Sequence, residues 1–262
     1  MRTSEGGLLH VVFVGESKYT AIRKRSLHDR DLADTTIDQI GSTPDSLRPG
    51  SVCFVALAND EATEQSKRLL ESGCHVFLDT PLLPLRDLQH LAAIAEEAGV
   101  EVGLSRPLRY SEPIAGWTDR ATIAGISAEF GDAPESWQTC LLDTLDLSVY
   151  LCGSGNARRV EASVERADRL WPVFAAISLR FDNGSLALAT LRKTPSSPGP
   201  TRCTITAGPA VQELEIVVGA ESYAAETTDF LRRVARGTPA PVSVSDGLAG
   251  VRLLDQVQAL LR

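Results

Sequence analysis

The stretch from Val52 to Leu82, VCFVALANDEATEQSKRLLESGCHVFLDTPL, decides the fold class of this chain. It opens on a continuous apolar run, continues through a polar segment of helical character over Asp60–Ser72, and returns to an apolar run at His75–Leu78. Gly73 follows the polar segment, and a glycine at such a place commonly ends a helix. Short, fully apolar strands are typical of a parallel sheet that is covered on both faces. The stretch therefore predicts a strand–helix–strand unit.

The same alternation extends over the first part of the chain. Apolar or β-branched runs at Leu9–Val14, Thr35–Ile37 and Val100–Leu104 predict further strands, and a second helix begins after Pro84. Strands and helices that alternate at this spacing need right-handed crossover connections. We therefore expect residues 1–110 to form a Rossmann-like, dinucleotide-binding-type domain with a parallel sheet.

The pattern changes after Arg109, where strand signals come to dominate. The clearest is a hairpin over Phe174–Lys193, with Asn183-Gly184 in its turn. Helices are predicted at Gln138–Leu151, Tyr223–Arg236 and Asp246–Leu261. We expect residues 111–262 to form an α+β domain with an open-faced, mostly antiparallel sheet for substrate binding or oligomerisation, with the last helices packing back.

Composition excludes several classes of protein. The 262 residues carry a formal net charge of -8, and basic clusters such as Arg23-Lys24-Arg25 are short, which argues against nucleic-acid binding. The five cysteines contain no C-x-x-C pair, which argues against a zinc site and a disulfide framework. No apolar stretch approaches the roughly 18 to 20 residues of a membrane span, and the N-terminus lacks the features of a secretory signal. We expect a cytoplasmic protein without metal, membrane or nucleic-acid partners.

Three strings resemble the Gfo/Idh/MocA oxidoreductases, the family of glucose-fructose oxidoreductase and inositol dehydrogenase. The opening stretch matches the family's apolar strand, Asn, helix, Gly-Lys-His-Val and Glu-Lys-Pro. LLDTLDLSVYLCG, residues 141–153, stands where the family has a His-x-x-Asp helix, and DFLRRVARGTPAPVSVSDGLAGVRLLD, residues 229–255, matches its C-terminal ending. The resemblance implies a Rossmann domain, an open sheet, an NAD(P) cofactor, a small-molecule ligand and a homodimer or larger assembly formed through the sheet.

The nucleotide loop departs from the family pattern. A dinucleotide site uses G-x-G-x-x-G so that backbone amides at a helix N-terminus approach the pyrophosphate. Here the loop is GESKYTA, residues 15–21, in which Gly15 stands but Ser17 and Thr20 take the second and third glycine positions. These hydroxyls could hold another anion together with Lys18, or they could simply cap an ordinary strand-to-helix turn.

The remaining cofactor and proton-transfer positions are also altered. Asp38 is the nearest candidate for the family's ribose-binding acid, and Asn59 matches its Asn after the strand. Thr80 replaces the family's proton-handling lysine, and a lone threonine hydroxyl cannot take up a proton at neutral pH. The cofactor candidates are Gly15, Ser17, Thr20, Asp38 and Asn59. The cofactor itself stays unknown. NAD(P) is compatible with the fold, but the missing glycines weaken the case for NAD(P) binding.

A pair of aspartates offers a different chemistry. Asp143 and Asp146 align with the family's His and Asp, and a spacing of three places them on one helix face. Together with Asp79 they could form an acidic cluster that supplies an acid and a base without lysine. Alternatively, both aspartates face solvent, or Asp143 pairs with an arginine. The catalytic candidates are Asp79, Thr80, Asp143, Asp146 and Arg109, with Arg106 as a further partner for an anion.

Three functions therefore remain open. The first is a divergent enzyme that performs a non-redox step on a small polar metabolite. The second is an NAD(P)-dependent reductase or dehydrogenase with an unusual proton donor. The third is a non-catalytic metabolite-binding protein or partner subunit, which would use an apolar open sheet face expected to comprise Ala175, Ile177, Leu179, Leu186, Leu188 and Thr190.

Overall fold

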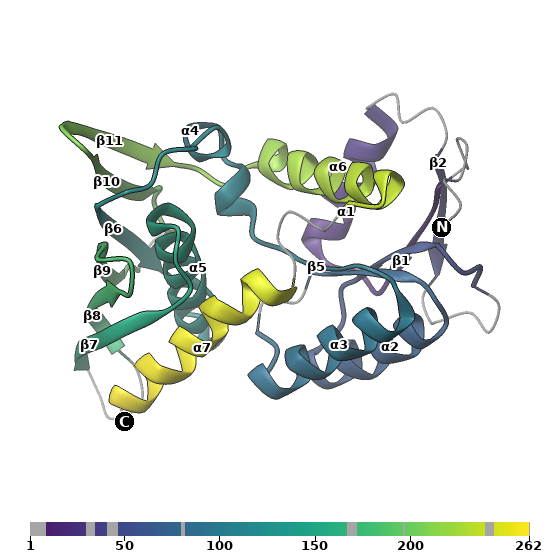
Figure 1. Ribbon diagram of the computed structural model, residues 1–262, viewed down its shortest axis with the longest axis horizontal. Coiled ribbons are helices and arrows are strands. Elements are labelled where there is room, and N and C mark those ends of the chain that lie inside the picture. Colours follow the sequence, from purple (N-terminus) through teal and green to yellow (C-terminus); the bar gives the residue numbers. More distant parts are fainter. Residues whose placement is uncertain are drawn as a thin grey trace. The chain divides into compact units, whose positions relative to one another are not determined.

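A computed structural model describes residues 9–29, 35–40, 47–79, 82–166, 172–195, 197–238 and 244–261. The chain forms two compact units, whose elements are labelled in Figure 1. The first contains residues 1–105 and 223–245, and the second contains residues 106–222 and 246–262. The chain thus leaves the first unit after Ser105 and returns to it at Tyr223. Among the described residues, no helix has the length and apolar character needed to cross a bilayer.

The first unit is built on a five-stranded parallel sheet in the order β2-β1-β3-β4-β5, which confirms the predicted Rossmann-like architecture. Its strands are β1 (Leu9–Val14), β2 (Thr35–Ile40), β3 (Val52–Val55), β4 (His75–Leu78) and β5 (Val102–Leu104). Its helices are α1 (Lys18–Asp29), α2 (Asn59–Glu71), α3 (Leu85–Ala98) and most of α6 (Ala220–Arg236). The strand order reverses between β1 and β3, which is where open α/β sheets usually bind ligands.

Helix α6 completes the core of this unit although it lies far along the chain. Its Phe230 ring lies 5.0 Å from the ring of Phe77, and Phe77 lies 5.2 Å from Phe54. Gly103 in β5 makes this approach possible, because a Cβ atom there would lie only 2.7 Å from the Phe230 ring. The absence of a side chain at residue 103 therefore lets α6 pack close to the sheet.

The second unit is built on a six-stranded sheet in the order β11-β10-β6-β9-β8-β7. Its strands are β6 (Ile123–Phe130), β7 (Ala157–Arg166), β8 (Pro172–Phe181), β9 (Leu186–Lys193), β10 (Thr201–Ala207) and β11 (Ala210–Ile216). Its helical elements are η1 (Pro107–Tyr110), α4 (Glu112–Ala115), α5 (Pro134–Cys152) and α7 (Val244–Leu260), whose first two residues belong to the first unit. Only the β6–β9 pair is parallel, so the predicted mostly antiparallel sheet is confirmed, as is the predicted β8–β9 hairpin.

The two faces of this sheet differ in burial, and one prediction about them was wrong. Helix α5 packs against β6 and β9 on one face. Ala175, Ile177 and Leu179 lie on that buried face, not on the open face where we expected them. Leu188 is 46% exposed on the opposite face, which is the open one. Successive side chains in a strand point to opposite faces, so the β8 residues of the open face are those one position away from the expected ones.

Candidate functional site

The loop after β1 turns at Gly15, which has a φ of +84°. A Cβ atom at this position would lie 2.4 Å from the carbonyl oxygen of Ala56 and 2.7 Å from the Leu57 side chain. The loops that follow β1 and β3 are therefore in close contact at the point where the strand order reverses. Only glycine satisfies both the positive φ and this contact.

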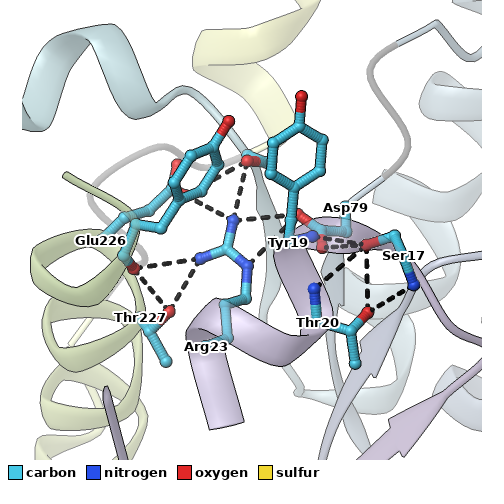
Figure 2. Close-up of polar contacts among 9 residues, drawn as sticks. Ser17, Tyr19, Thr20, Arg23, Asp79, Glu226 and Thr227 are labelled. Atoms are coloured by element: carbon cyan, nitrogen blue, oxygen red, sulfur yellow. Dashed lines mark hydrogen bonds and ion pairs between the residues drawn. The ribbon is translucent and has the colours of Figure 1, made fainter. Parts of the chain in front are cut away.

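Ser17 and Thr20 cap helix α1 reciprocally, as Figure 2 shows. The Ser17 Oγ atom accepts hydrogen bonds from the backbone N–H groups of Tyr19 (3.2 Å) and Thr20 (3.1 Å). The Thr20 Oγ1 atom in turn accepts one from the backbone N–H of Ser17 (3.1 Å). This is the arrangement of a capping box, with threonine in the place usually held by Glu or Gln. The geometry matches the simpler alternative for this loop, a turn capped by its own serine and threonine.

Arg23 lies one turn further along α1 and is completely buried. Its Nε and Nη2 atoms lie 3.2 and 2.9 Å from Asp79 Oδ1, and Nη2 also lies 2.6 Å from Glu226 Oε2 (Figure 2). Both carboxylate side chains are almost fully buried as well. One guanidinium thus joins α1 to the end of β4 and to helix α6.

The other nitrogen of the guanidinium group is also engaged. Arg23 Nη1 donates to the carbonyl oxygen of Tyr223 (3.3 Å) and to Thr227 Oγ1 (2.7 Å). The guanidinium carbon lies 4.6 Å from the centroid of the Phe77 ring. Burial opposes the charged form of Arg23, but Glu226 and Asp79 together hold its pKa above the ordinary value. All three guanidinium nitrogens of Arg23 thus have hydrogen-bond acceptors, and the cluster places a charged group inside the core of the unit.

The structure brings together several of the residues predicted from the sequence. Asp79 Oδ2 lies 3.5 Å from Ser17 Oγ, so Gly15, Ser17, Thr20 and Asp79 belong to one region of the first unit. The direct ionic partner of Asp79 is Arg23. Asn59 is the exposed first residue of α2, and its carbonyl oxygen accepts a hydrogen bond from Thr63.

Two predicted residues lie outside what the structure describes. Thr80 is not among the described residues. The backbone of Asp38 belongs to β2, where it pairs with Val12, but its side chain is not described. Their assignment to proton transfer and to ribose binding stays a prediction.

The second unit contains a separate cluster around Asp146, which is buried in α5. Arg109 Nε and Nη2 donate to the two carboxylate oxygens of Asp146, each at 2.7 Å. Arg106 Nε lies 3.4 Å from Asp146 Oδ1. The guanidinium of Arg109 also lies 5.1 Å from the centroid of the Tyr150 ring. A bidentate pair of this kind fixes both side chains, and the aspartate that it engages is Asp146, not Asp143, for which an arginine partner was considered.

Asp143 lies on the same helix and is half-buried. Burial together with the Asp143 carboxylate raises the pKa of the neighbouring Cys140 thiol to about 12. Asp79 belongs to the first unit and the two helix aspartates to the second. The proposed acidic cluster of all three therefore stays a prediction. The described residues contain no group of three side chains that could hold a metal ion.

Sequence reasoning missed Arg23, Glu226 and Thr227. Arg23 was grouped with its basic neighbours, although its spacing from Thr20 and Leu27 carries a usable signal. The side chains of Thr20, Arg23 and Leu27 are all buried, and they share one face of α1. An arginine on the buried stripe of an amphipathic helix requires a buried carboxylate partner. No local signal identifies Glu226 as that partner, because it lies 203 residues away.

Comparisons with known proteins agree with this fold. No family model matches the sequence, and no curated protein matches it significantly. Among solved structures, a probable dehydrogenase from Thermotoga maritima is 15% identical with a TM-score of 0.80, and covers 97% of each chain. The UDP-N-acetylglucosamine 3-dehydrogenase GnnA from Acidithiobacillus ferrooxidans is 14% identical with a TM-score of 0.77, again over 97% of each chain.

A putative myo-inositol dehydrogenase from Sinorhizobium meliloti 1021 is 11% identical with a TM-score of 0.78 over 97% of each chain. The chain thus has the fold of the Gfo/Idh/MocA oxidoreductases, and the predicted resemblance is confirmed at the level of fold. Fold and function are separable, so the activity has to be argued from the site.

Proposed function

We propose that this chain is a dinucleotide-independent protein of the dehydrogenase fold, which acts on a small polar metabolite by proton transfer instead of hydride transfer. The observation that carries this proposal is the capping of α1. In dinucleotide-binding proteins the pyrophosphate accepts hydrogen bonds from amides at this helix N-terminus. Here the amides of Tyr19 and Thr20 already donate to Ser17 Oγ, so a phosphate would have to displace a hydroxyl from its own helix.

The charge next to this helix supports the same conclusion. Asp79 Oδ2 lies 3.5 Å from Ser17 Oγ, so a pyrophosphate placed at the α1 N-terminus would meet a carboxylate of like charge. Asp79 cannot move away at low cost, because it is tied to the buried Arg23. Breaking a buried pair of this kind costs about 3 to 5 kcal/mol. The residues present therefore do not fit NAD(P), and we assign no step to it.

The proposed proton transfer is assigned to the second unit. Asp143 is half-buried and is the candidate for the group that exchanges a proton with the substrate. Asp146 is held by Arg109 and Arg106, and we assign it a positioning role. Arg109 already presents its Nε–Nη2 edge to Asp146, so its role in this proposal is to hold that carboxylate in place.

Binding of nicotinamide dinucleotides tests the first part of the proposal. The purified chain is titrated with NADH and with NADPH while nucleotide fluorescence and thermal stability are followed. We expect neither a fluorescence change nor thermal stabilisation at the micromolar to millimolar concentrations at which enzymes commonly bind their substrates. Binding at micromolar concentration would overturn the proposal and favour an NAD(P)-dependent reductase, the activity that the dehydrogenase fold itself suggests.

A pair of variants tests the second part. Asp143→Asn is introduced in the native host, with Asp132→Asn as its control, because Asp132 is an exposed residue whose carboxylate pairs with Lys193. We expect Asp143→Asn to change the metabolite profile of the host and Asp132→Asn to leave it unchanged. Identical profiles for both variants and the wild type, at equal amounts of folded protein, would count against catalysis and favour a metabolite-binding or partner-subunit role.

A further inference from the structure

A cavity of about 350 Å³ opens on the face of the second unit's sheet opposite the buried side. Ser127 on β6 and Thr190 on β9 line it, and each alternates along its strand with buried neighbours such as Ala128 and Leu191. The two residues are direct partners across the β6–β9 pair. Their hydroxyl groups therefore lie side by side at the base of the cavity.

These two hydroxyl groups are not used by the protein itself. Neither Ser127 nor Thr190 makes a side-chain hydrogen bond to any residue that the structure describes. In the first unit, by contrast, the hydroxyl groups of Ser17 and Thr20 accept backbone hydrogen bonds and cap helix α1. A hydroxyl group is both a donor and an acceptor, so the base of the cavity offers two such groups to a ligand.

Two arginines lie close to this pair of hydroxyl groups. Arg202 on β10 is the direct strand partner of Ser127, and Arg192 lies two residues beyond Thr190 on β9. Arg192 Nη2 donates to Glu129 Oε1 at 2.7 Å, and Arg202 Nε donates to Glu215 Oε1 at 3.1 Å. Each guanidinium thus uses one nitrogen within the described chain and keeps the others for a ligand. The planar fork of an arginine matches a carboxylate or a phosphate.

Glu129 adds a fixed acceptor to the same cavity. Its Oε2 atom accepts the backbone N–H of Gly199 at 3.1 Å, while Oε1 accepts the bond from Arg192. The hydrogen bond from Arg192, followed by that from Gly199, holds the pKa of Glu129 below its usual range. An ionised carboxylate repels a bare anion but accepts a hydrogen bond from a hydroxyl group. The ligand side facing Glu129 is therefore expected to carry hydroxyl groups.

An apolar wall limits the cavity on one side. Phe174, which is 37% exposed, and Pro200 both line it. Ligand pockets commonly combine such apolar surface with a few placed polar groups, and this cavity lies at the small end of their range.

We infer that this cavity binds a small anion that also carries hydroxyl groups, of the class of hydroxy acids and phosphorylated polyols. The arginines Arg192 and Arg202 hold the anionic group, while Ser127, Thr190 and Glu129 bind the hydroxyl groups. The site shares no residue with the Asp143–Asp146 region or with the α1 loop. It therefore stands independently of the proposed function.

Calorimetric titration of the full chain with four probes tests the ligand class. Gluconate and glycerol 3-phosphate carry both an anionic group and hydroxyl groups, while glycerol and inorganic phosphate each carry one of the two. We expect gluconate or glycerol 3-phosphate to bind at least tenfold more tightly than either control, and the preferred one identifies the anionic group. Equal or absent binding of all four compounds would overturn the inference.

Variants of the cavity test its location. Arg192→Gln and Thr190→Val remove one ligand group each without altering the buried core, and Arg159→Gln removes a comparably exposed arginine on β7. We expect the first two to weaken binding of the preferred probe at least tenfold and the third to leave it unchanged. Loss of binding in Arg109→Gln but not in the cavity variants would overturn the inference and assign the ligand to the Asp146 cluster.

Measuring the oligomeric state distinguishes a ligand-binding cavity from a contact between subunits. If sedimentation shows a dimer that Arg192→Gln dissociates while probe binding does not change, the cavity is a contact between subunits and the inference is wrong. An unchanged oligomeric state together with weakened probe binding supports it.

Discussion

Two hydrogen bonds join Arg23 to Asp79, from Nε at 3.2 Å and from Nη2 at 2.9 Å, and both reach the same carboxylate oxygen. The two residues are 56 positions apart, one on helix α1 and the other just after β4. Both side chains are almost completely removed from solvent. A charge pair therefore connects the first helix of the unit to the carboxyl end of strand β4.

Removing the cation of this pair should be strongly destabilising. In Arg23→Met the carboxylates of Asp79 and Glu226 would remain buried without their guanidinium. We expect the free energy of unfolding to fall by about 3 to 5 kcal/mol. Urea unfolding followed by circular dichroism measures the difference.

An exposed ion pair supplies the control. Arg68 pairs with Glu64 at 3.1 Å on the surface of α2, where both side chains are more than half exposed. Arg68→Met should cost no more than about 1 kcal/mol. Equal losses of unfolding free energy in the two variants would show that the buried Arg23 pairs contribute no more to stability than an exposed ion pair.

The cap of α1 makes a second prediction. Ser17→Ala removes the acceptor for the amides of Tyr19 and Thr20, and should lower the free energy of unfolding by about 1 kcal/mol. Ser17→Gly lacks the same hydroxyl but should cost only a few tenths of a kcal/mol, since glycine is itself tolerated at this position. Urea unfolding of both variants checks the order, and an alanine variant as stable as the wild type would contradict the capping role.

Gly103 makes a third prediction, about packing. A Cβ atom at residue 103 would lie 2.7 to 2.8 Å from the rings of Phe230 and Phe77. Gly103→Ala should therefore destabilise the fold by about 1 to 3 kcal/mol, as overpacking usually does. Gly116→Ala is the control, because a Cβ atom there meets nothing within 4 Å. The change in midpoint of thermal unfolding compares the two, and similar midpoints would show that α6 packs differently.

His75 makes a fourth prediction, about pH. Its Nδ1 atom accepts the backbone N–H of Glu101 at 3.0 Å, and burial lowers the pKa of the ring below its ordinary value of 6.5. The folded chain therefore holds the neutral ring, while the unfolded chain binds a proton below about pH 6.5. The contribution is fully present above that pH and is lost as the pH falls towards the lowered pKa of the folded state.

The variant His75→Gln tests this dependence. A glutamine oxygen can accept the same N–H but does not titrate. The free energy of unfolding of the wild type should fall more steeply than that of the variant below about pH 6.5. Parallel curves from about pH 5 to pH 8 would show that His75 is not responsible.

Local patterns in the sequence account for most of the fold. The apolar run Leu9–Val14 and the Asn183-Gly184 turn specify a strand and a hairpin from neighbouring residues alone, and both occur as predicted. Helix α5 begins at Pro134, four residues before the predicted start, because proline is well suited to the first turn of a helix. The expected apolar open face was partly wrong: Ala175, Ile177 and Leu179 do share one face of β8, but that face is the buried one, while the open face carries Ser178 and Arg180.

The candidate site was less accessible to sequence reasoning. Ser17 and Thr20 were recognised as departures from a glycine motif, but their mutual hydrogen bonds depend on side-chain geometry. The cluster around Arg23 depends on Glu226 and Thr227, which are more than 200 residues away. Contacts of such range leave no local pattern.

The return of the chain at Tyr223 sets an order on its biosynthesis. A nascent chain that has emerged up to Ser105 carries all five strands of the parallel sheet but lacks Phe230, which covers Phe77, and Glu226, which pairs with Arg23. Phe77 therefore stays uncovered, and Arg23 lacks one of its two carboxylate partners, while the ribosome adds more than a hundred further residues. The N-terminal unit is thus begun first and finished late, so the interval between these two events is when the growing chain most needs protection from aggregation.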